Sequence, residues 1–285
     1  MPVTVEQLGP PLDTRPLLRT VRFRLDDLVD ALEGDDWHRP TVCPGWQVRD
    51  LVAHLIGDDL GRLSRTHDGE PGPGPRPGED LPRYIDRLND EWVVALRRLS
   101  PPVLLSLLGA GGVEVVEFWD AIDLDAPTDG VSWAGLDDGP AWMDLARDTT
   151  EYWIHEQQIR EAVDRPLHDA VEAGTVIDVL ARGLPYALRS VDAPHGAVVV
   201  VRAEDVGAAW LVGRRDGRWW FGRRTALERL AGMAPPYATV SADAATLWRR
   251  WSRHPDGRSG AFAREGDAAA AAAVVDHLAI IRPDD

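Results

Sequence analysis

The amino-acid sequence predicts an α+β protein of two domains, a helix bundle over residues 1–165 followed by a smaller α+β domain over residues 166–285. Three observations indicate this organisation. Four long stretches of the first part place apolar residues at helical spacing, whereas the second part alternates helical stretches with short strand-like ones. The charge also changes, because the whole net charge of -16 lies in residues 1–165, and Pro166 follows the last helical pattern there.

The first part is expected to be helical throughout. Gly34 supplies a stop after the first helix, and Pro140 lies near the first turn of the fourth, where proline is tolerated. Residues 71–78, with the sequence PGPGPRPG, cannot hold a helix and are expected to form a mobile connection. Residues 101–127 carry a weaker pattern that indicates only a short helix over 113–121. The four long helices cover residues 15–33, 47–65, 81–99 and 140–163, and without a convincing strand they predict a four-helix bundle.

The second part is expected to combine helices with a small sheet. Asp216–Gly217 is a two-residue hairpin signal between two of the strand-like stretches. The expected strands cover residues 197–202, 210–214, 218–223 and 237–241, and the expected helices cover residues 168–189, 244–253 and 267–278.

Composition and charge argue against several classes of protein. The chain has 47 acidic residues against 31 basic ones, all of them arginine, which argues against sequence-independent binding of nucleic acid. Cys43 is the only cysteine, so an intramolecular disulfide and a thiolate-rich metal site are excluded. The N-terminus lacks the apolar core of a secretory signal, and no apolar run approaches the roughly 18 residues of a membrane span. A soluble, cytoplasmic protein that binds neither nucleic acid nor membrane is therefore expected.

Two further features have a simpler interpretation than ligand binding. Cys43 precedes a Pro-Gly turn, and we expect it to be a buried structural residue rather than a reactive thiol. Trp219 and Trp220 lie among arginines, a pattern seen in nucleic-acid platforms, but outward arginines are ordinary on a hairpin. The arginines concerned are Arg214, Arg215, Arg218, Arg223 and Arg224.

Three side chains on two of the expected helices have the spacing of a metal site. Glu151 and His155 are four residues apart and therefore lie one turn above each other on one helix face. His54 lies at the edge of the apolar stripe of its helix, from which it can turn toward the bundle interior. Two imidazoles and one carboxylate can hold a divalent cation and leave positions open for a ligand. The alternative, a surface Glu–His ion pair beside a structural histidine, is the commoner outcome of such spacing.

Two motifs resemble those of a known family. Residues 36–55, DWHRPTVCPGWQVRDLVAHL, resemble the N-terminal signature of the mycothiol-dependent maleylpyruvate isomerase family, and residues 151–162, EYWIHEQQIREA, resemble its second signature. The resemblance implies a DinB-like four-helix bundle followed by a sterol-carrier-like α/β domain. It also implies a metal held by His54, Glu151 and His155, with zinc as the expected metal and mycothiol as the thiol cofactor.

The implied function is an enzyme that adds a thiolate to a small electrophile, either as a cis–trans isomerase or as a thiol S-transferase. Open positions on the metal would bind the thiol and lower its pKa. Gln158 stands where the family usually has an aspartate, as a neutral partner for the metal-bound imidazole. Arg253 resembles a family arginine suited to a carboxylate substrate. The alternatives are a non-catalytic metal-binding or regulatory module, and a lipid-binding protein in which the region of Trp219 and Phe221 lines a tunnel.

Overall fold

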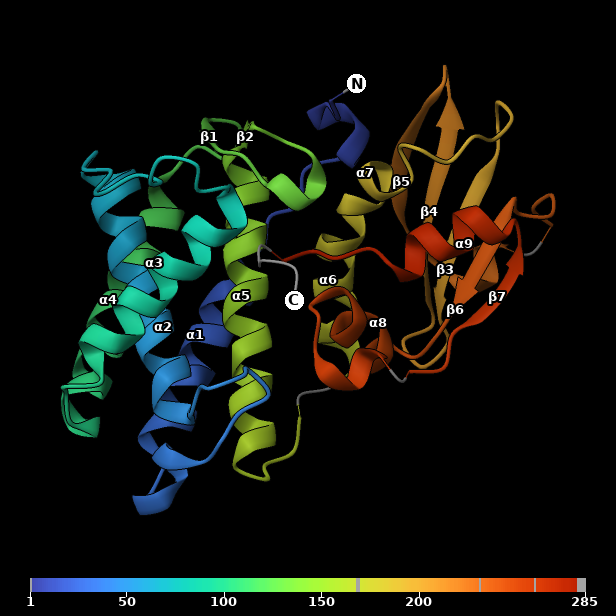
Figure 1. Cartoon of the computed structure of the whole chain (residues 1–285). Helices are drawn as coiled ribbons and strands as arrows, with labels where there is room; N and C mark the ends of the chain where they lie inside the picture. Colours follow the sequence, from blue (N-terminus) through green and yellow to red (C-terminus); the bar gives the residue numbers. More distant parts are fainter. Residues whose placement is uncertain (1, 168–169, 231, 259, 281–285) are drawn as a thin grey trace. The chain divides into compact units, whose positions relative to one another are not determined.

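The computed structural model describes residues 2–167, 170–230, 232–258 and 260–280. These residues form helices and two sheets, as the predicted α+β class requires (Figure 1). They divide into two compact units. The helical unit contains Asp13–Thr128 and Leu145–Leu167, and the sheet unit contains Met1–Leu12, Asp129–Asp144 and His168–Ile280. Each unit is thus built from separate segments, whereas the sequence analysis placed one boundary after residue 165, and that boundary stays a prediction.

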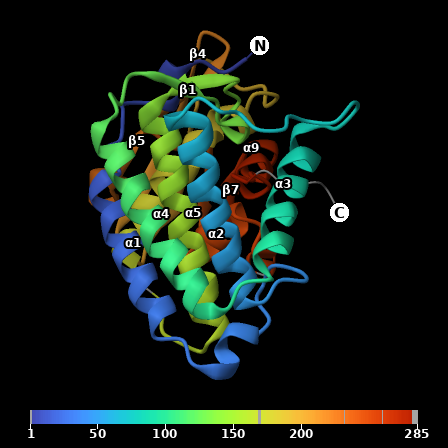
Figure 2. The same ribbon diagram turned by 90° about the vertical axis from the view of Figure 1, so that its left-hand side faces the viewer.

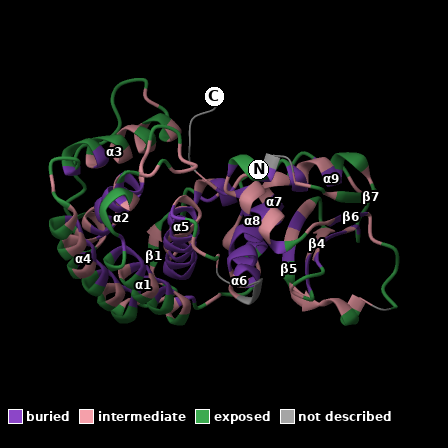
Figure 3. Ribbon diagram, turned by 90° about the horizontal axis from the view of Figure 1, so that it is seen from below, coloured by how far each residue is buried: buried purple, intermediate pink, exposed green. Residues whose placement is uncertain are grey.

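The helical unit is built from five helices, four of which run side by side, with α3 beside α2 (Figure 2). Their bounds are α1 (Arg15–Asp30), α2 (Val48–Arg62), α3 (Leu81–Leu96), α4 (Pro101–Ala121) and α5 (Ala141–Ala162). Residues of α2 and α5 are mostly buried, whereas exposed residues concentrate on α1, α3 and α4 (Figure 3). The two helices that carry the candidate ligands are therefore the most enclosed of the unit.

Local sequence explains where these helices begin and end. Asp80 accepts a hydrogen bond from the backbone N–H of Arg83 at 3.0 Å and caps α3, which has proline in its first turn. A π-helical turn over Leu63–His67 continues α2 and precedes the exposed segment 71–78. All four predicted long helices are present, with bounds that differ by a few residues.

Helix α4 corrects the sequence analysis, which expected only a short helix over 113–121. The helix starts at Pro101 and includes glycines that lower its propensity. Two of them are required by packing: a Cβ atom at Gly112 would overlap the guanidinium of Arg22, and one at Gly111 would lie 3.1 Å from the Cβ of Asp59. Tertiary contacts that are invisible in the sequence thus explain why the pattern looks weak.

Within the described residues, α4 is the one helix whose length and composition would allow it to cross a membrane. It packs against α1 and α2 and buries Leu104, Leu108, Val115 and Trp119. Core helices of soluble proteins pass the same test, so this single helix is weak evidence for a span. The absence of a membrane partner stays a prediction.

The larger sheet has five strands in the order β5-β4-β3-β6-β7. Strands β3 and β6 are parallel, and the other neighbouring pairs are antiparallel. Asp216 and Gly217 form the predicted hairpin turn between β4 and β5, both with positive φ (50° and 73°), as a type I′ turn requires. The strands are β3 (Val198–Ala203), β4 (Ala208–Arg215), β5 (Arg218–Ala226), β6 (Ala238–Ser241) and β7 (Ala263–Gly266).

Three strands were not predicted. Strand β7 lies at the sheet edge with all four residues exposed, so it lacks the apolar alternation that marks a strand. Strands β1 (Pro127–Asp129) and β2 (Asp138–Pro140) pair with each other and have only three residues each. Such short segments carry too few side chains to produce a pattern.

The helices of the sheet unit are α6 (Ala170–Leu180), α7 (Leu184–Ala187), α8 (Ala244–Trp251) and α9 (Ala268–Val275). The single helix predicted over 168–189 is divided by a 3-10 turn at Ala181–Gly183, and its first two residues lie outside the described part of the chain. Asp243 and Asp267 cap α8 and α9 through the backbone N–H groups of Thr246 and Ala270.

The segment before Gly9 belongs to the sheet unit because buried polar groups hold it there. Gln7 donates to the carbonyl of Trp219 at 2.7 Å, and Arg182 donates to the carbonyls of Leu8 and Pro10 at 2.9 and 2.6 Å. The guanidinium of Arg182 also lies 5.2 Å from the ring centroid of Phe221. Trp219 and Phe221 are therefore occupied core positions, and they lend no support to the lipid-tunnel alternative.

Candidate metal centre

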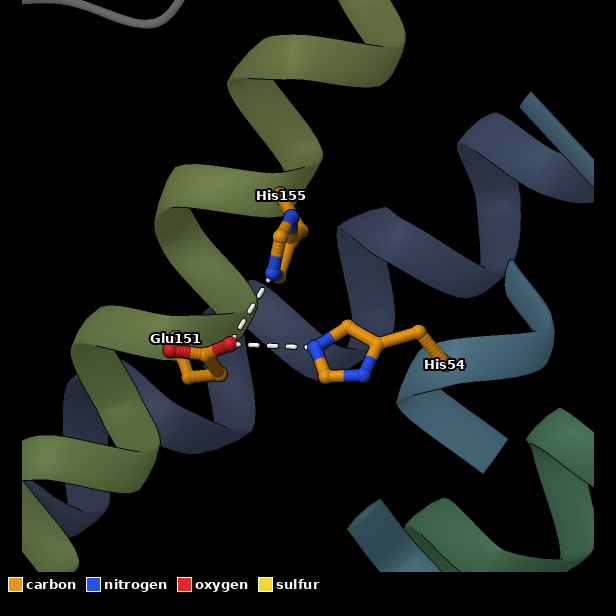
Figure 4. A group of neighbouring side chains, drawn as sticks. All are labelled: His54, Glu151 and His155. Carbon is orange, nitrogen blue, oxygen red and sulfur yellow. Dashed lines mark hydrogen bonds and ion pairs between the residues drawn. The ribbon is translucent and has the colours of Figure 1, made fainter. Parts of the chain in front are cut away.

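Helices α2 and α5 bring together the three side chains that the sequence singled out (Figure 4). His54 extends from the middle of α2, and Glu151 and His155 extend from successive turns of α5. Nε2 of His54 lies 3.1 Å from Oε1 of Glu151, and Nε2 of His155 lies 2.9 Å from the same oxygen. The two imidazole rings meet edge to face, with centroids 4.9 Å apart.

The geometry of these donors fits a small divalent cation. Donor atoms of the three residues all lie within 4.8 Å of one another. Two ligands that are each roughly 2.0–2.1 Å from a tetrahedral zinc ion lie about 3.3 Å from each other. The two nitrogen–oxygen distances at Glu151 are close to that value. Two nitrogens and one carboxylate also match the borderline preference of zinc, nickel or cobalt.

The centre is enclosed on one side and open on the other. The whole His54 residue is 4% exposed, whereas the side chain of Glu151 keeps 44% of its accessible surface. The ring of Trp46, in the turn that precedes α2, lies 5.3 Å from the ring of His54. Glu151 is therefore the donor of the centre that is most accessible to solvent.

The carboxylates around His54 favour the protonated, positively charged form of its imidazole. Burial by itself would lower the pKa of His54, but the carboxylate of Asp58 and the hydrogen bond to Glu151 outweigh it and raise that pKa to about 9. Loss of hydration by burial would raise the pKa of Glu151, but the imidazoles of His155 and His54 hold that pKa well below its usual value. Without a cation the centre is therefore an imidazolium–carboxylate ion pair.

Gln158 occupies the position behind His155. Its Oε1 accepts a hydrogen bond from Nδ1 of His155 at 2.7 Å, which leaves Nε2 as the atom that faces Glu151. The thiol of Cys43 donates to the same oxygen at 3.4 Å. Gln158 thus fixes the orientation of the imidazole, as outer partners of metal-binding histidines do. Cys43 is only half-buried, so the expectation of a buried structural cysteine is corrected.

Replacing Gln158 with leucine is expected to weaken zinc binding by roughly 10-fold or more, because Nδ1–H of His155 loses its acceptor. Gln158→Asp, which supplies the carboxylate usual in the family, is expected to bind zinc at least as tightly as the wild type. Competition with a chromogenic chelator measures both affinities. Equal affinities for wild type and Gln158→Leu would show that the hydrogen bond does not support the centre.

Asp58 is a nearby group that the sequence analysis missed. Its Oδ2 lies 3.4 Å from Nε2 of His54, one helical turn further along α2. The spacing of His54 and Asp58 is the same four residues that drew attention to Glu151 and His155, and the same rule would have found it.

Two further carboxylates lie on α5. Asp144 is fully buried, in the part of α5 that belongs to the sheet unit. Asp148 is largely buried as well and accepts from Nη2 of Arg62 at 2.8 Å and from Nε1 of Trp119 at 3.2 Å. Arg253 belongs to the sheet unit, follows α8 and has a left-handed backbone (φ 61°). Its role in substrate binding stays a prediction.

Comparisons with known proteins place this centre in a wider context. The family model described as the mycothiol maleylpyruvate isomerase N-terminal domain matches residues 18–160, a range that contains all three candidate ligands. Two crystal structures of mycothiol-dependent maleylpyruvate isomerase, one of them a histidine-to-alanine mutant, match with a TM-score of 0.54. They are 17% and, for the mutant, 16% identical to this chain, and each match covers 93% of this chain and 98% of theirs. Likeness at this identity shows the fold. The search of curated proteins finds no match.

Proposed function

Because this chain belongs to the family of the mycothiol maleylpyruvate isomerase N-terminal domain, we propose that it is a metal- and mycothiol-dependent enzyme acting on a small electrophile. The observation that carries the proposal is the convergence of His54, Glu151 and His155 inside the matched range. The names of the structural relatives favour a cis–trans isomerase over an S-transferase.

Within this proposal, His54 and His155 supply imidazole nitrogens and Glu151 supplies a carboxylate to a divalent cation, with zinc as the expected metal. When bound, the cation supplies positive charge that lowers the pKa of a thiol. Gln158 holds the imidazole of His155 in place, and Trp46 covers the ring of His54. The exposed side of Glu151 is where thiol and electrophile would enter. Arg253 remains the candidate for binding a substrate carboxylate.

When bound, mycothiol would supply a sulfur nucleophile whose reversible addition to an activated cis double bond would allow cis–trans isomerisation with the thiol regenerated, as in conversion of maleylpyruvate to fumarylpyruvate. An S-transferase would stop after the addition and consume one thiol per product.

The finer description of the fold is part of the same proposal. We infer that α1, α2, α4 and α5 correspond to a DinB-like four-helix bundle, in which α4 takes the place that the sequence analysis gave to the helix over 81–99, and that the sheet unit corresponds to a sterol-carrier-like domain. Support comes from the family match and from the fold likeness across most of the chain. A cytoplasmic location and the absence of a nucleic-acid partner stay predictions.

Zinc affinity is expected to fall as the pH is lowered. A cation that binds Nε2 of His54 must displace the proton held there, and the raised pKa of about 9 keeps that proton in place at neutral pH. Below about pH 9 the apparent affinity should therefore drop about tenfold for each pH unit. Chelator competition at several pH values measures the slope. An affinity that stays constant between about pH 7 and 8.5 would contradict the raised pKa of His54.

Turnover of maleylpyruvate and of a panel of other electrophiles tests the function. The zinc-loaded wild type is expected to require mycothiol, to regenerate it in the isomerase reaction, and to lose turnover when Glu151 is replaced by glutamine. His67→Ala changes an exposed histidine of the same unit and serves as the matched control. A zinc-loaded protein that turns over no electrophile with mycothiol would favour the non-catalytic metal-binding module.

A further inference from the structure

A second group of polar side chains lies beside the centre, inside the helical unit. We call Arg22, Asp59, Tyr152, Arg62 and Asp148 the polar clamp. Asp59, Arg22 and Tyr152 are 0%, 3% and 2% exposed. Nothing in the proposed reaction uses these residues, although charged groups are rarely placed so deeply without a partner.

The contacts of the clamp join all four of the adjacent helices. Oδ1 of Asp59 accepts from the hydroxyl of Tyr152 at 2.6 Å, and its Oδ2 accepts from Nη2 of Arg22 at 2.9 Å. The same Nη2 donates to the carbonyl of Leu108 in α4 at 3.0 Å. The guanidinium of Arg22 also lies 4.5 Å from the ring centroid of Tyr152.

Between α2 and α5, the clamp continues the contacts of the metal centre. His54 faces Glu151 and His155, Asp59 faces Tyr152, and Arg62 faces Asp148. Residues later in α2 contact residues earlier in α5, so the two helices are antiparallel. The contacts Asp59–Tyr152 and Arg62–Asp148 therefore join the same two helices that bring His54 to Glu151.

Apolar packing alone defines such a register loosely. Helix surfaces repeat nearly every turn, and sliding by one turn moves a side chain about 5.4 Å along the axis. A metal bond of roughly 2 Å does not survive such a shift. A buried carboxylate, in contrast, is satisfied only when its particular donors are opposite, because an unpaired charge inside the protein is costly.

We propose that the polar clamp positions the metal ligands by fixing the register of α2 against α5, with Tyr152 as its principal positioning residue. The inference rests on the proposed metal centre. Tyr152 is directly next to Glu151 in the chain, and Asp59 is five residues beyond His54, so the contact between Tyr152 and Asp59 lies within two turns of the ligands.

The test compares Tyr152→Phe with wild type. Phenylalanine keeps the ring and removes only the hydroxyl that donates to Asp59. Zinc affinity is measured by chelator competition, and the visible spectrum of the Co²⁺-loaded protein reports the geometry of the ligands. We expect zinc affinity to fall by at least about tenfold, the scale on which groups outside the ligand shell act, together with a changed Co²⁺ spectrum.

Asp50→Asn is the matched control. Asp50 is a buried carboxylate of the same helix, and it pairs with Arg97 near the end of α3 rather than with α5. The control is expected to lose stability in urea while it keeps the zinc affinity and Co²⁺ spectrum of the wild type. If Tyr152→Phe does not fold, Arg62→Met tests the other contact of the clamp with the same expectation.

Unchanged zinc affinity and Co²⁺ spectrum in Tyr152→Phe would overturn the positioning role. An equal loss of affinity in Asp50→Asn would also overturn it, because general destabilisation would then suffice. A wild type that binds no zinc would refute the proposed function itself. The two failures are therefore distinguished by the wild-type measurement.

Discussion

Replacing His155 with alanine is expected to abolish stoichiometric zinc binding. The variant keeps His54 and Glu151 but loses one of three donors, and even partners outside the ligand shell contribute 10- to 100-fold to affinity. Zinc affinity should therefore fall by more than about 100-fold, and thiol-dependent turnover should fall with it. Metal analysis after dialysis against a weak chelator, with zinc titration of the same sample, measures the loss.

The matched control for this prediction is His67→Ala. His67 belongs to the same unit, and its exposed side chain lies against Asp68 rather than at the centre. Its replacement should leave zinc content, turnover and the urea midpoint unchanged. Full zinc content and turnover in His155→Ala would exclude His155 as a ligand and with it the proposed centre.

The second large effect is expected for Arg22→Leu. Removal of the guanidinium takes away the cationic partner of the buried Asp59 carboxylate, which then keeps the hydrogen bond from the hydroxyl of Tyr152. Breaking a buried ion pair in this way costs roughly 3–5 kcal/mol in the free energy of unfolding. Urea unfolding measured for both proteins checks the value.

The pH dependence of Arg22→Leu provides an independent readout. Burial already raises the pKa of Asp59 to about 6 although Arg22 opposes the rise, and loss of Arg22 should raise it further. A carboxyl whose pKa is higher in the folded state than in the unfolded chain favours folding at low pH. Stability of the variant should therefore fall as the pH rises from about 4, the pKa of an unperturbed aspartate, to the raised pKa above about 6, and then level off.

Arg19→Leu is the control, because it removes an exposed arginine–aspartate pair of α1 instead of the buried one. Arg19 of α1 pairs with Asp120 of α4 on the surface, where an ion pair contributes at most about 1 kcal/mol. A loss of stability in Arg22→Leu no larger than in Arg19→Leu would contradict the importance of the buried pair.

The sequence predicted the long helices and most of the sheet because their apolar residues repeat with the period of the element. It failed for α4, where Gly111 and Gly112 make room for Asp59 and Arg22, and for β7, whose residues are all exposed. These features depend on neighbours that are distant in the chain. A local pattern cannot represent them.

The candidate centre was predictable because Glu151 and His155 lie at a helical spacing on α5, and because His54 and this pair each fall within a recognisable motif. The role of Gln158 beside His155 was implied by the family resemblance, but the approach of Cys43 to Gln158 joins residues 115 positions apart. Burial of Asp148 likewise depends on partners distant in the chain, Arg62 and Trp119, which come from two other helices. Only the folded chain reveals such partners.

The most direct test of the account is a crystal structure of the zinc-loaded protein with anomalous data collected at the zinc edge. The account predicts one zinc ion between α2 and α5, with Nε2 of His54 and of His155 and an oxygen of Glu151 each within roughly 2.0–2.2 Å. Zinc bound elsewhere, or no anomalous peak beside these three side chains, would contradict it.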